Sequence, residues 1–230
     1  MHILHSPDIW RDFPRVVPGV LAIEGIRPDV DVTPRVAAFE RVAAERLATG
    51  TESDLAEIQA WRRAFARMGL KPTQYRSASE SLLRRFRKEE TLPRLHPLID
   101  LCNAVSLAFA IPIATFDVTR LTGHVEVRYA NGTETFETFS GETEHPDPDE
   151  VIFADEAGRA HARRWCHRQS AFSAVRDTTS SVLIVAEAMH DDAALDIPRL
   201  ITTLAAEVSG AWSVPTTSAV LSAASPRFDV

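Results

Sequence analysis

The spacing of apolar residues in the N-terminal half of the chain predicts a series of helices. The first begins at Thr33-Pro34, a typical helix start, ends near Gly50 and carries apolar residues at helical intervals. The same spacing predicts further helices over residues 53–68, 81–87 and 98–109. Ser77 and Glu80 have the spacing of a capping box in front of the second of these.

Strands are predicted where β-branched residues dominate or where apolar and polar residues alternate. One such segment, residues 16–26, lies early in the chain. The others follow later, at residues 111–117, 124–129, 133–139, 151–154, 160–165 and 181–186. Asn131-Gly132 favours a type I′ turn, so we expect residues 124–129 and 133–139 to form a β-hairpin. A last helix is expected over 198–209, and the tail after Trp212 is expected to fray.

Helices that precede most of the strands, without a regular strand–helix–strand alternation, predict an α+β fold. We expect a helical N-terminal half packed on a mixed or antiparallel β-sheet, in a single domain over residues 1–230. Within it, residues 1–70 supply a strand and helices, residues 71–190 the core, and residues 191–230 a C-terminal helix and tail. With 230 residues, 45% of them hydrophobic, the chain can bury a full core.

Charge is unevenly distributed along the chain. The net charge is −7, but residues 60–94 hold ten Lys or Arg against three Glu, a local charge of +7. Such a segment can hold a phosphate backbone, and it can equally be a solvated helix face. The candidates for phosphate contacts are Arg84, Arg85 and Lys88.

No targeting signal is visible in the sequence. No apolar run approaches the ~20 residues that span a bilayer, and the N-terminus lacks the pattern of a signal peptide. Cys102 and Cys166 lie far apart, which suits a reducing compartment better than a disulfide framework. We therefore expect a cytoplasmic protein with no membrane partner.

Two segments carry polar groups in unusual settings. The predicted helix 98–109 is apolar, yet Asp100, Asn103 and Ser106 lie on one side of it, where they either bond neighbouring loops or face a cavity. Residues 165–170 contain five polar or aromatic side chains of the kinds that recognise ligands. The chain has no Gly-rich phosphate loop, Cys-x-x-Cys, His-Glu-x-x-His or Gly-x-Ser-x-Gly motif, and we expect no cofactor and no metal.

Five short blocks follow one another between Leu98 and Glu187. They are Ile99-Asp-Leu-Cys-Asn103, Pro112-Ile-Ala-Thr-Phe-Asp117, Gly123-His-Val-Glu-Val-Arg128, Glu150-Val-Ile-Phe-Ala-Asp155 and Thr178-Thr-Ser-Ser-Val-Leu-Ile-Val-Ala-Glu187. Over these blocks the chain resembles the B3/B4 editing domain of the bacterial phenylalanyl-tRNA synthetase β subunit. The resemblance implies a B3/B4-like fold. The chain has no room for class II catalytic motifs, so it should not make aminoacyl-tRNA by itself.

The resemblance also implies a reaction, the hydrolysis of the ester between a wrong amino acid and its tRNA. Asn103 and Glu187 match pocket residues of the family and are the expected catalytic residues. The expected substrate-binding residues are Asp100, Trp165, His167, Arg168 and Ser170, and the expected tRNA-binding residues are Arg84, Arg85 and Lys88. We therefore expect a trans-acting aminoacyl-tRNA deacylase whose partner is aminoacylated tRNA.

The chain departs from the family pattern at two places. Ala114 stands where the family has a histidine, and the bulky segment 163–169 replaces a glycine-rich one. Tyrosine specificity is therefore not implied. Two other functions stay open: a non-catalytic module that binds tRNA or an amino acid, and hydrolysis of another amino-acid ester or amide. The oligomeric state is left open.

Overall fold

A four-stranded antiparallel sheet forms the centre of the computed structural model, which describes residues 1–230. Its strands, in spatial order, are β11 (Thr216–Val220), β2 (Val17–Glu24), β10 (Ser181–Ala188) and β3 (Ile113–Asp117). Both faces of this sheet are covered. Val182 and Ile184 of β10 face one hydrophobic cluster, whereas Leu183 and Val185 face another. Burial on both faces explains why β10 is a nearly continuous apolar run.

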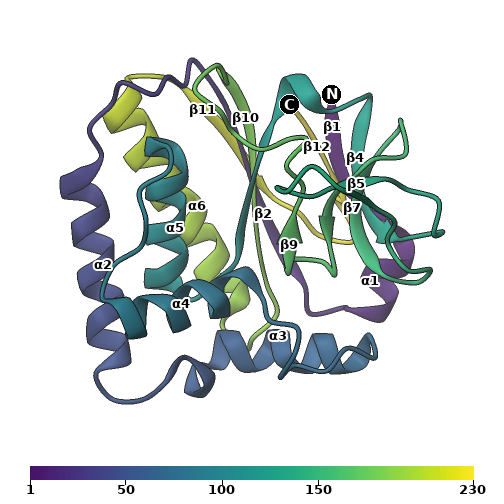
Figure 1. Ribbon diagram of the computed structural model, residues 1–230, viewed down its shortest axis with the longest axis horizontal. Helices are drawn as coiled ribbons and strands as arrows, with labels where there is room; N and C mark the ends of the chain where they lie inside the picture. Colours follow the sequence, from purple (N-terminus) through teal and green to yellow (C-terminus); the bar gives the residue numbers. More distant parts are fainter.

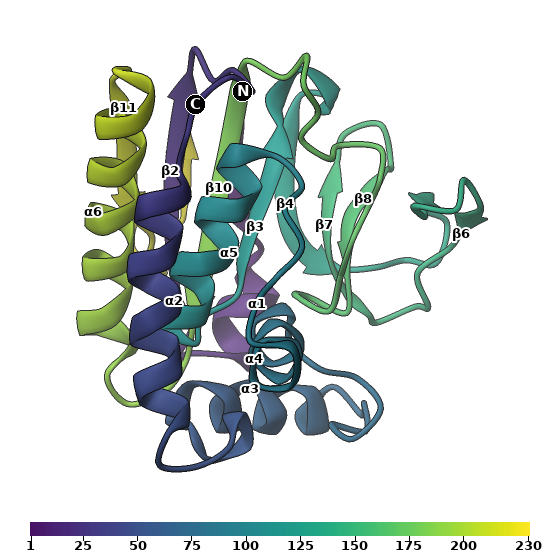
Figure 2. The same ribbon diagram turned by 60° about the vertical axis from the view of Figure 1, so that its left-hand side comes forward.

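Three helices cover one face of the central sheet (Figures 1 and 2). They are α2 (Thr33–Leu47), α5 (Pro97–Phe109) and α6 (Ala193–Trp212). A six-stranded mixed sheet covers the other face. Its strands, in spatial order, are β12 (Arg227–Asp229), β1 (His2–His5), β4 (His124–Tyr129), β7 (Val151–Asp155), β8 (Ala160–Arg163) and β9 (Arg168–Gln169). The molecule is therefore a three-layer arrangement of helices, central sheet and outer sheet.

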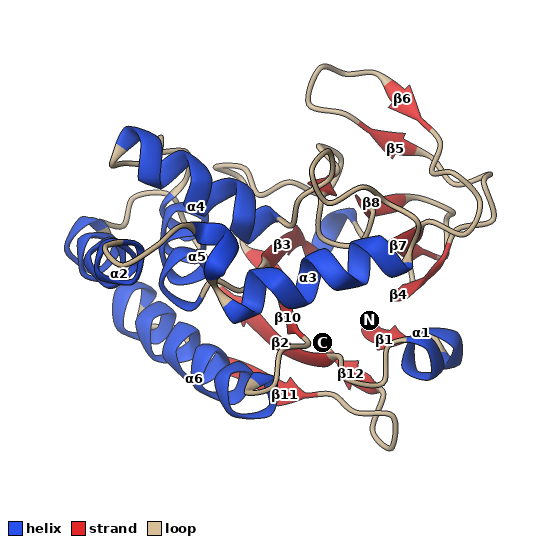
Figure 3. Ribbon diagram, turned by 90° about the horizontal axis from the view of Figure 1, so that it is seen from below, coloured by secondary structure: helices blue, strands red, loops and turns tan.

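Shorter elements close the ends of these layers. Helix α3 (Ala56–Arg67) runs across the lower edge of the molecule in Figure 1 and crosses the view in Figure 3. The remaining elements are α1 (Pro7–Asp12), α4 (Ala78–Glu89), the 3₁₀ turns η1 (Glu52–Asp54) and η2 (Val118–Arg120), and the small strands β5 (Phe136–Glu137) and β6 (Thr143–Glu144). None of the helices combines the length and hydrophobicity that crossing a membrane needs.

The α+β class and most predicted elements are confirmed. The helices expected in the N-terminal half are present, and the segments 111–117, 151–154, 160–165 and 181–186 each contain a strand. Ser77 caps α4, where its hydroxyl accepts a hydrogen bond from the backbone N–H of Glu80.

The predicted β-hairpin at Asn131-Gly132 is wrong. A type I′ turn needs positive φ at both central residues, but only Gly132 has it, with φ of 89°. The Glu134 carboxylate instead accepts hydrogen bonds from the backbone N–H groups of Asn131 and Gly132, and Asn131 accepts one from the backbone of Thr133. Strand β4 therefore pairs with β1 and β7, while β5 pairs with β6 in an excursion that projects from the molecule (Figure 2).

The expectation that the tail frays is also wrong, and the last helix is longer than predicted. Helix α6 begins at Ala193, five residues before Pro198, and ends at Trp212. After it, β11 pairs with β2, and β12 pairs with β1 at the edge of the outer sheet. The tail is thus ordered by strand pairing at the edges of two sheets.

Candidate functional site

A cavity opens where the central and outer sheets meet. Its interior offers about 50 Å³ to a water-sized molecule, and its walls come from β3, β7, β8 and β10 and from residues 165–169. Ile113 and Ala114 of β3, Phe153 of β7, Ala162 of β8 and Val185 of β10 make much of the lining apolar. The first residue of α4 closes one side.

A buried carboxylate, Glu187, lines this cavity from β10. One of its oxygens lies 2.6 Å from Nε2 of His5, and the other accepts a hydrogen bond of 2.8 Å from Nε1 of Trp165. Because a carboxylate oxygen only accepts, the facing His5 nitrogen carries a hydrogen. Both oxygens of Glu187 are therefore held in place by side chains from other strands and turns.

An aromatic wall supports Trp165. Its indole is completely buried and lies edge-on to Trp61 of α3 and to Phe13, with ring centres 5.2 Å and 4.8 Å away. Such edge-to-face pairs are favourable and restrict the ring to one orientation. The wall thus fixes the indole N–H toward Glu187.

The turn after β8, which delivers Trp165 and His167 to the cavity, has an unusual backbone. Arg164 and Trp165 both have positive φ, 47° and 61°, a region that bulky residues rarely adopt. The backbone N–H of Trp165 donates to Val151, and that of Arg164 donates to Glu150, whose carboxylate also binds Arg163. Strain of this kind persists where the surroundings impose it and often marks functional sites. Here it places large side chains in the cavity wall.

His167 lies half-buried in the same wall. Its Nδ1 is 2.7 Å from the carbonyl oxygen of Arg76, and its ring lies edge-on to Tyr75 at 5.4 Å. Burial lowers the pKa of His167, and Arg164 and Arg168 lower it further, against the bond to the Arg76 carbonyl. The imidazole is therefore uncharged at neutral pH.

Four of the residues predicted from the sequence line the cavity: Glu187, Trp165, His167 and Arg168. The Arg168 guanidinium pairs with Glu144, with a distance of 3.0 Å.

Three other predicted residues do not line it. The Asp100 carboxylate accepts a hydrogen bond from the backbone of Leu95, and the Ser170 hydroxyl donates to the carbonyl of Glu137. Asn103 is half-buried on α5. The roles expected for these three residues stay predictions.

His5 and the pair Tyr75–Arg76 were missed as site residues. His5 comes from β1, 182 residues from Glu187, and no local signal in the sequence connects the two. Tyr75 and Arg76 precede α4 in a segment that reads as a linker. Only the folded chain brings them into contact with residues of the cavity wall.

The predicted tRNA-binding residues lie on α4 and are exposed. Arg85 forms an ion pair with Glu89, and Arg84 lies 3.9 Å from Glu52. Lys88 is exposed in the last turn of the same helix. Part of the local positive charge is thus balanced by neighbouring carboxylates.

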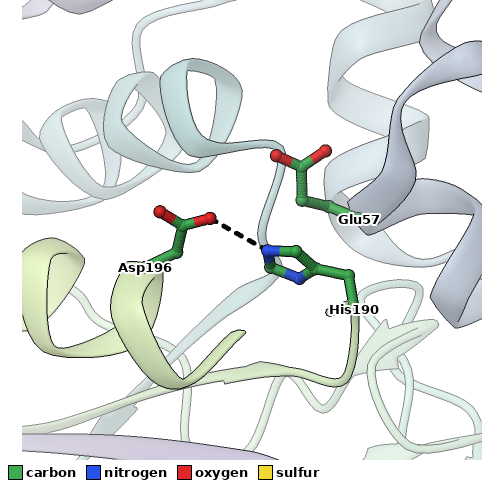
Figure 4. A group of neighbouring side chains, drawn as sticks. All are labelled: Glu57, His190 and Asp196. Atoms are coloured by element: carbon green, nitrogen blue, oxygen red, sulfur yellow. Dashed lines mark hydrogen bonds and ion pairs between the residues drawn. The ribbon is translucent and has the colours of Figure 1, made fainter. Parts of the chain in front are cut away.

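A second polar cluster lies outside the cavity (Figure 4). It consists of Glu57 of α3, Asp196 of α6 and His190, which precedes α6. Nε2 of His190 lies 2.9 Å from the Asp196 carboxylate. Glu57 forms an ion pair of 2.6 Å with Arg46, and Asp196 lies 3.4 Å from Arg199. Both carboxylates therefore already have cationic partners, and a metal ion would have to displace them.

The family model and the curated relatives indicate the same domain. The B3/4 domain model matches residues 60–200. The chain is 32% identical over 90 residues to the phenylalanine–tRNA ligase β subunit of Shewanella oneidensis, which is 39% of this chain and 11% of that protein. It is 33% identical over 96 residues to the β subunit of Thermobifida fusca, which is 42% of this chain and 11% of that protein.

The chain thus spans about a tenth of the length of these relatives. A solved N-terminal fragment of the phenylalanyl-tRNA synthetase β subunit from Pyrococcus horikoshii superposes with a TM-score of 0.49 and 10% identity. That superposition covers 95% of this chain and 53% of that one.

Proposed function

Because the chain belongs to the B3/4 domain family, we propose that it is a trans-acting deacylase that hydrolyses the ester of a mischarged aminoacyl-tRNA. The observation that carries this proposal is the carboxylate of Glu187 in the wall of a largely apolar cavity. An amino-acid ester presents a positively charged amino group beside a side chain. A carboxylate next to an apolar surface complements both features.

The reaction places modest demands on such a site. An ester at the end of a tRNA is already activated, so the site must orient the carbonyl group, place a water molecule and stabilise the developing oxyanion. Glu187 holds the α-amino group, and Arg168, from the same cavity wall, is a candidate donor for the oxyanion. Asn103, on α5, is the residue that matches the pocket asparagine of the resembled family.

A panel of correctly and wrongly charged tRNAs tests this proposal directly. We expect the wild type to release the amino acid from at least one mischarged tRNA. We expect Glu187→Gln, which removes the negative charge, to raise KM by about 10- to 100-fold, the equivalent of one charge-assisted hydrogen bond. Glu142→Gln, on an exposed loop, is the matched control. Absence of release from every charged tRNA, at high protein concentration, overturns the proposal.

The tRNA contact is tested by reversing the charge of α4. We expect Arg84→Glu with Arg85→Glu to weaken tRNA binding and to reduce its salt dependence, because phosphate contacts release counterions. Arg11→Glu with Arg227→Glu makes the same charge change at exposed, ion-paired arginines of α1 and β12. Equal tRNA affinity of the two double variants contradicts a role for α4.

Ala114 favours a second candidate function, a non-catalytic module that binds tRNA or an amino acid. It lines the cavity from β3 at the position where the resembled family carries a histidine, and its methyl group cannot transfer protons. This candidate predicts saturable binding of charged tRNA without release of the amino acid. The same panel, read by filter binding and by release, separates the two functions.

A further inference from the structure

Among the residues that line the cavity, only Cys166, His167 and Glu187 have side chains that can act as a base. Under the proposed function Glu187 binds the α-amino group, and its oxygens are also fixed by hydrogen bonds from His5 and Trp165. Burial raises the pKa of the Cys166 thiol well above its usual value. This leaves the imidazole of His167.

The contacts of His167 determine which ring nitrogen carries the hydrogen. Nδ1 lies 2.7 Å from the carbonyl oxygen of Arg76, which can only accept, and 3.3 Å from the backbone N–H of the same residue. The shorter contact requires a hydrogen on Nδ1. Nε2 then carries the lone pair, makes no hydrogen bond within the chain and is not fully buried.

The surroundings also fix the ring in place. Tyr75 packs against it edge-on, and the backbone of Arg76 holds Nδ1. On the other side, the left-handed backbone at Arg164 and Trp165 directs the turn into the cavity wall. A base held by a backbone carbonyl at one nitrogen and free at the other has the arrangement that general-base catalysis requires.

We propose that His167 is the general base of the deacylation, a role that rests on the proposed function. Nε2 accepts a proton from a water molecule as the water oxygen bonds to the ester carbonyl carbon. The bond between that carbon and the ribose oxygen then breaks, and the ribose oxygen takes the proton from Nε2. The products are the free amino acid and a tRNA with a free terminal hydroxyl.

A base in this position must be uncharged before it reacts. Burial, together with Arg164 and Arg168, lowers the pKa of His167, which keeps Nε2 unprotonated at neutral pH. The charged and titratable groups around the ring are Tyr75, Arg76, Glu150, Arg164, Cys166, Arg168 and Glu187.

The test is His167→Asn, because an Asn amide keeps a donor near the Nδ1 position but has no basic nitrogen. We expect kcat to fall by about 100- to 10,000-fold with little change in KM. The decrease of wild-type kcat on acidification below pH 6.5 should be absent from the variant. His145→Asn, an exposed histidine outside the cavity, is the control.

Nitrogen-15 NMR of the wild-type imidazole supplies a readout that does not depend on activity. We expect a hydrogen on Nδ1 and none on Nε2 at neutral pH. An Nε2–H tautomer, or a kcat of His167→Asn within twofold of the wild type, overturns the role of His167 while deacylation itself stands. A wild type that releases no amino acid from any charged tRNA overturns both proposals.

Discussion

Two of the polar clusters in this molecule, the one in the cavity and the one around His190, differ in the partners of their carboxylates. In the cavity, Glu187 is held by an imidazole and an indole, with no arginine bonded to it. In the second cluster, Glu57 and Asp196 are paired with Arg46 and Arg199. Both clusters join distant parts of the chain.

This difference in partners shows how a buried carboxylate can stay available for a ligand. An arginine partner satisfies the charge of a carboxylate and competes with any cation that approaches it. His5 and Trp165 fix the orientation of the Glu187 carboxylate by hydrogen bonds, and no guanidinium is bonded to it. The same principle applies to His167, whose anchor is a backbone carbonyl. Glu187 therefore has no bonded arginine that would compete with a cationic ligand.

The largest expected effect is a loss of stability, and its size should differ between the two clusters. Glu187→Ala leaves the buried donors of His5 and Trp165 without a partner, so we expect the free energy of unfolding to fall by about 4 kcal/mol. Glu57→Ala breaks a partly exposed ion pair and should cost about 1 kcal/mol. Urea unfolding of both variants measures the difference. Equal losses would remove the distinction between the clusters.

A smaller effect isolates one hydrogen bond of the cavity. Trp165 and Trp61 are both buried and touch edge to face, but only the Trp165 indole N–H has a partner, whereas that of Trp61 is buried without one. Both Trp→Phe changes remove the same volume. We therefore expect Trp165→Phe to be less stable than Trp61→Phe by about 2 kcal/mol, measured by urea unfolding. Equal stabilities would mean that the bond to Glu187 contributes nothing.

The smallest effect concerns pH. Burial lowers the pKa of His167 and of His96 below the usual 6.5, so as pH falls the unfolded chain binds these protons before the folded chain does. The free energy of unfolding should therefore decrease as pH falls below 6.5. We expect His167→Asn to remove its share of this decrease, below about 1 kcal/mol. An identical slope in wild type and His167→Asn contradicts the prediction.

Much of the fold could be predicted because it depends on local patterns. The spacing of apolar residues identified α2, α3 and α5, and the β-branched runs identified β2 and β10. The ordered blocks singled out Glu187, and the unusual content of residues 165–170 singled out Trp165, His167 and Arg168, all of which line the cavity. These features are carried by residues that are close together in the chain.

The failures have two physical causes, a local carboxylate and the pairing of strands that are distant in the chain. The hairpin at Asn131-Gly132 was excluded by the carboxylate of Glu134 and by the pairing of β4 with β1. The tail after Trp212 is ordered because it completes the edges of two sheets. Pairing between strands that are far apart in the chain leaves no signature in a local pattern.

The amino-acid sequence alone therefore predicted the class of the fold, most of its elements and four residues of the cavity wall. Only the tertiary structure decided that His5 reaches Glu187, that Arg76 anchors His167 and that Asn103 lies outside the cavity lining. Periodicity reports which side of an element is buried, whereas a hydrogen bond between distant segments depends on how the layers are stacked.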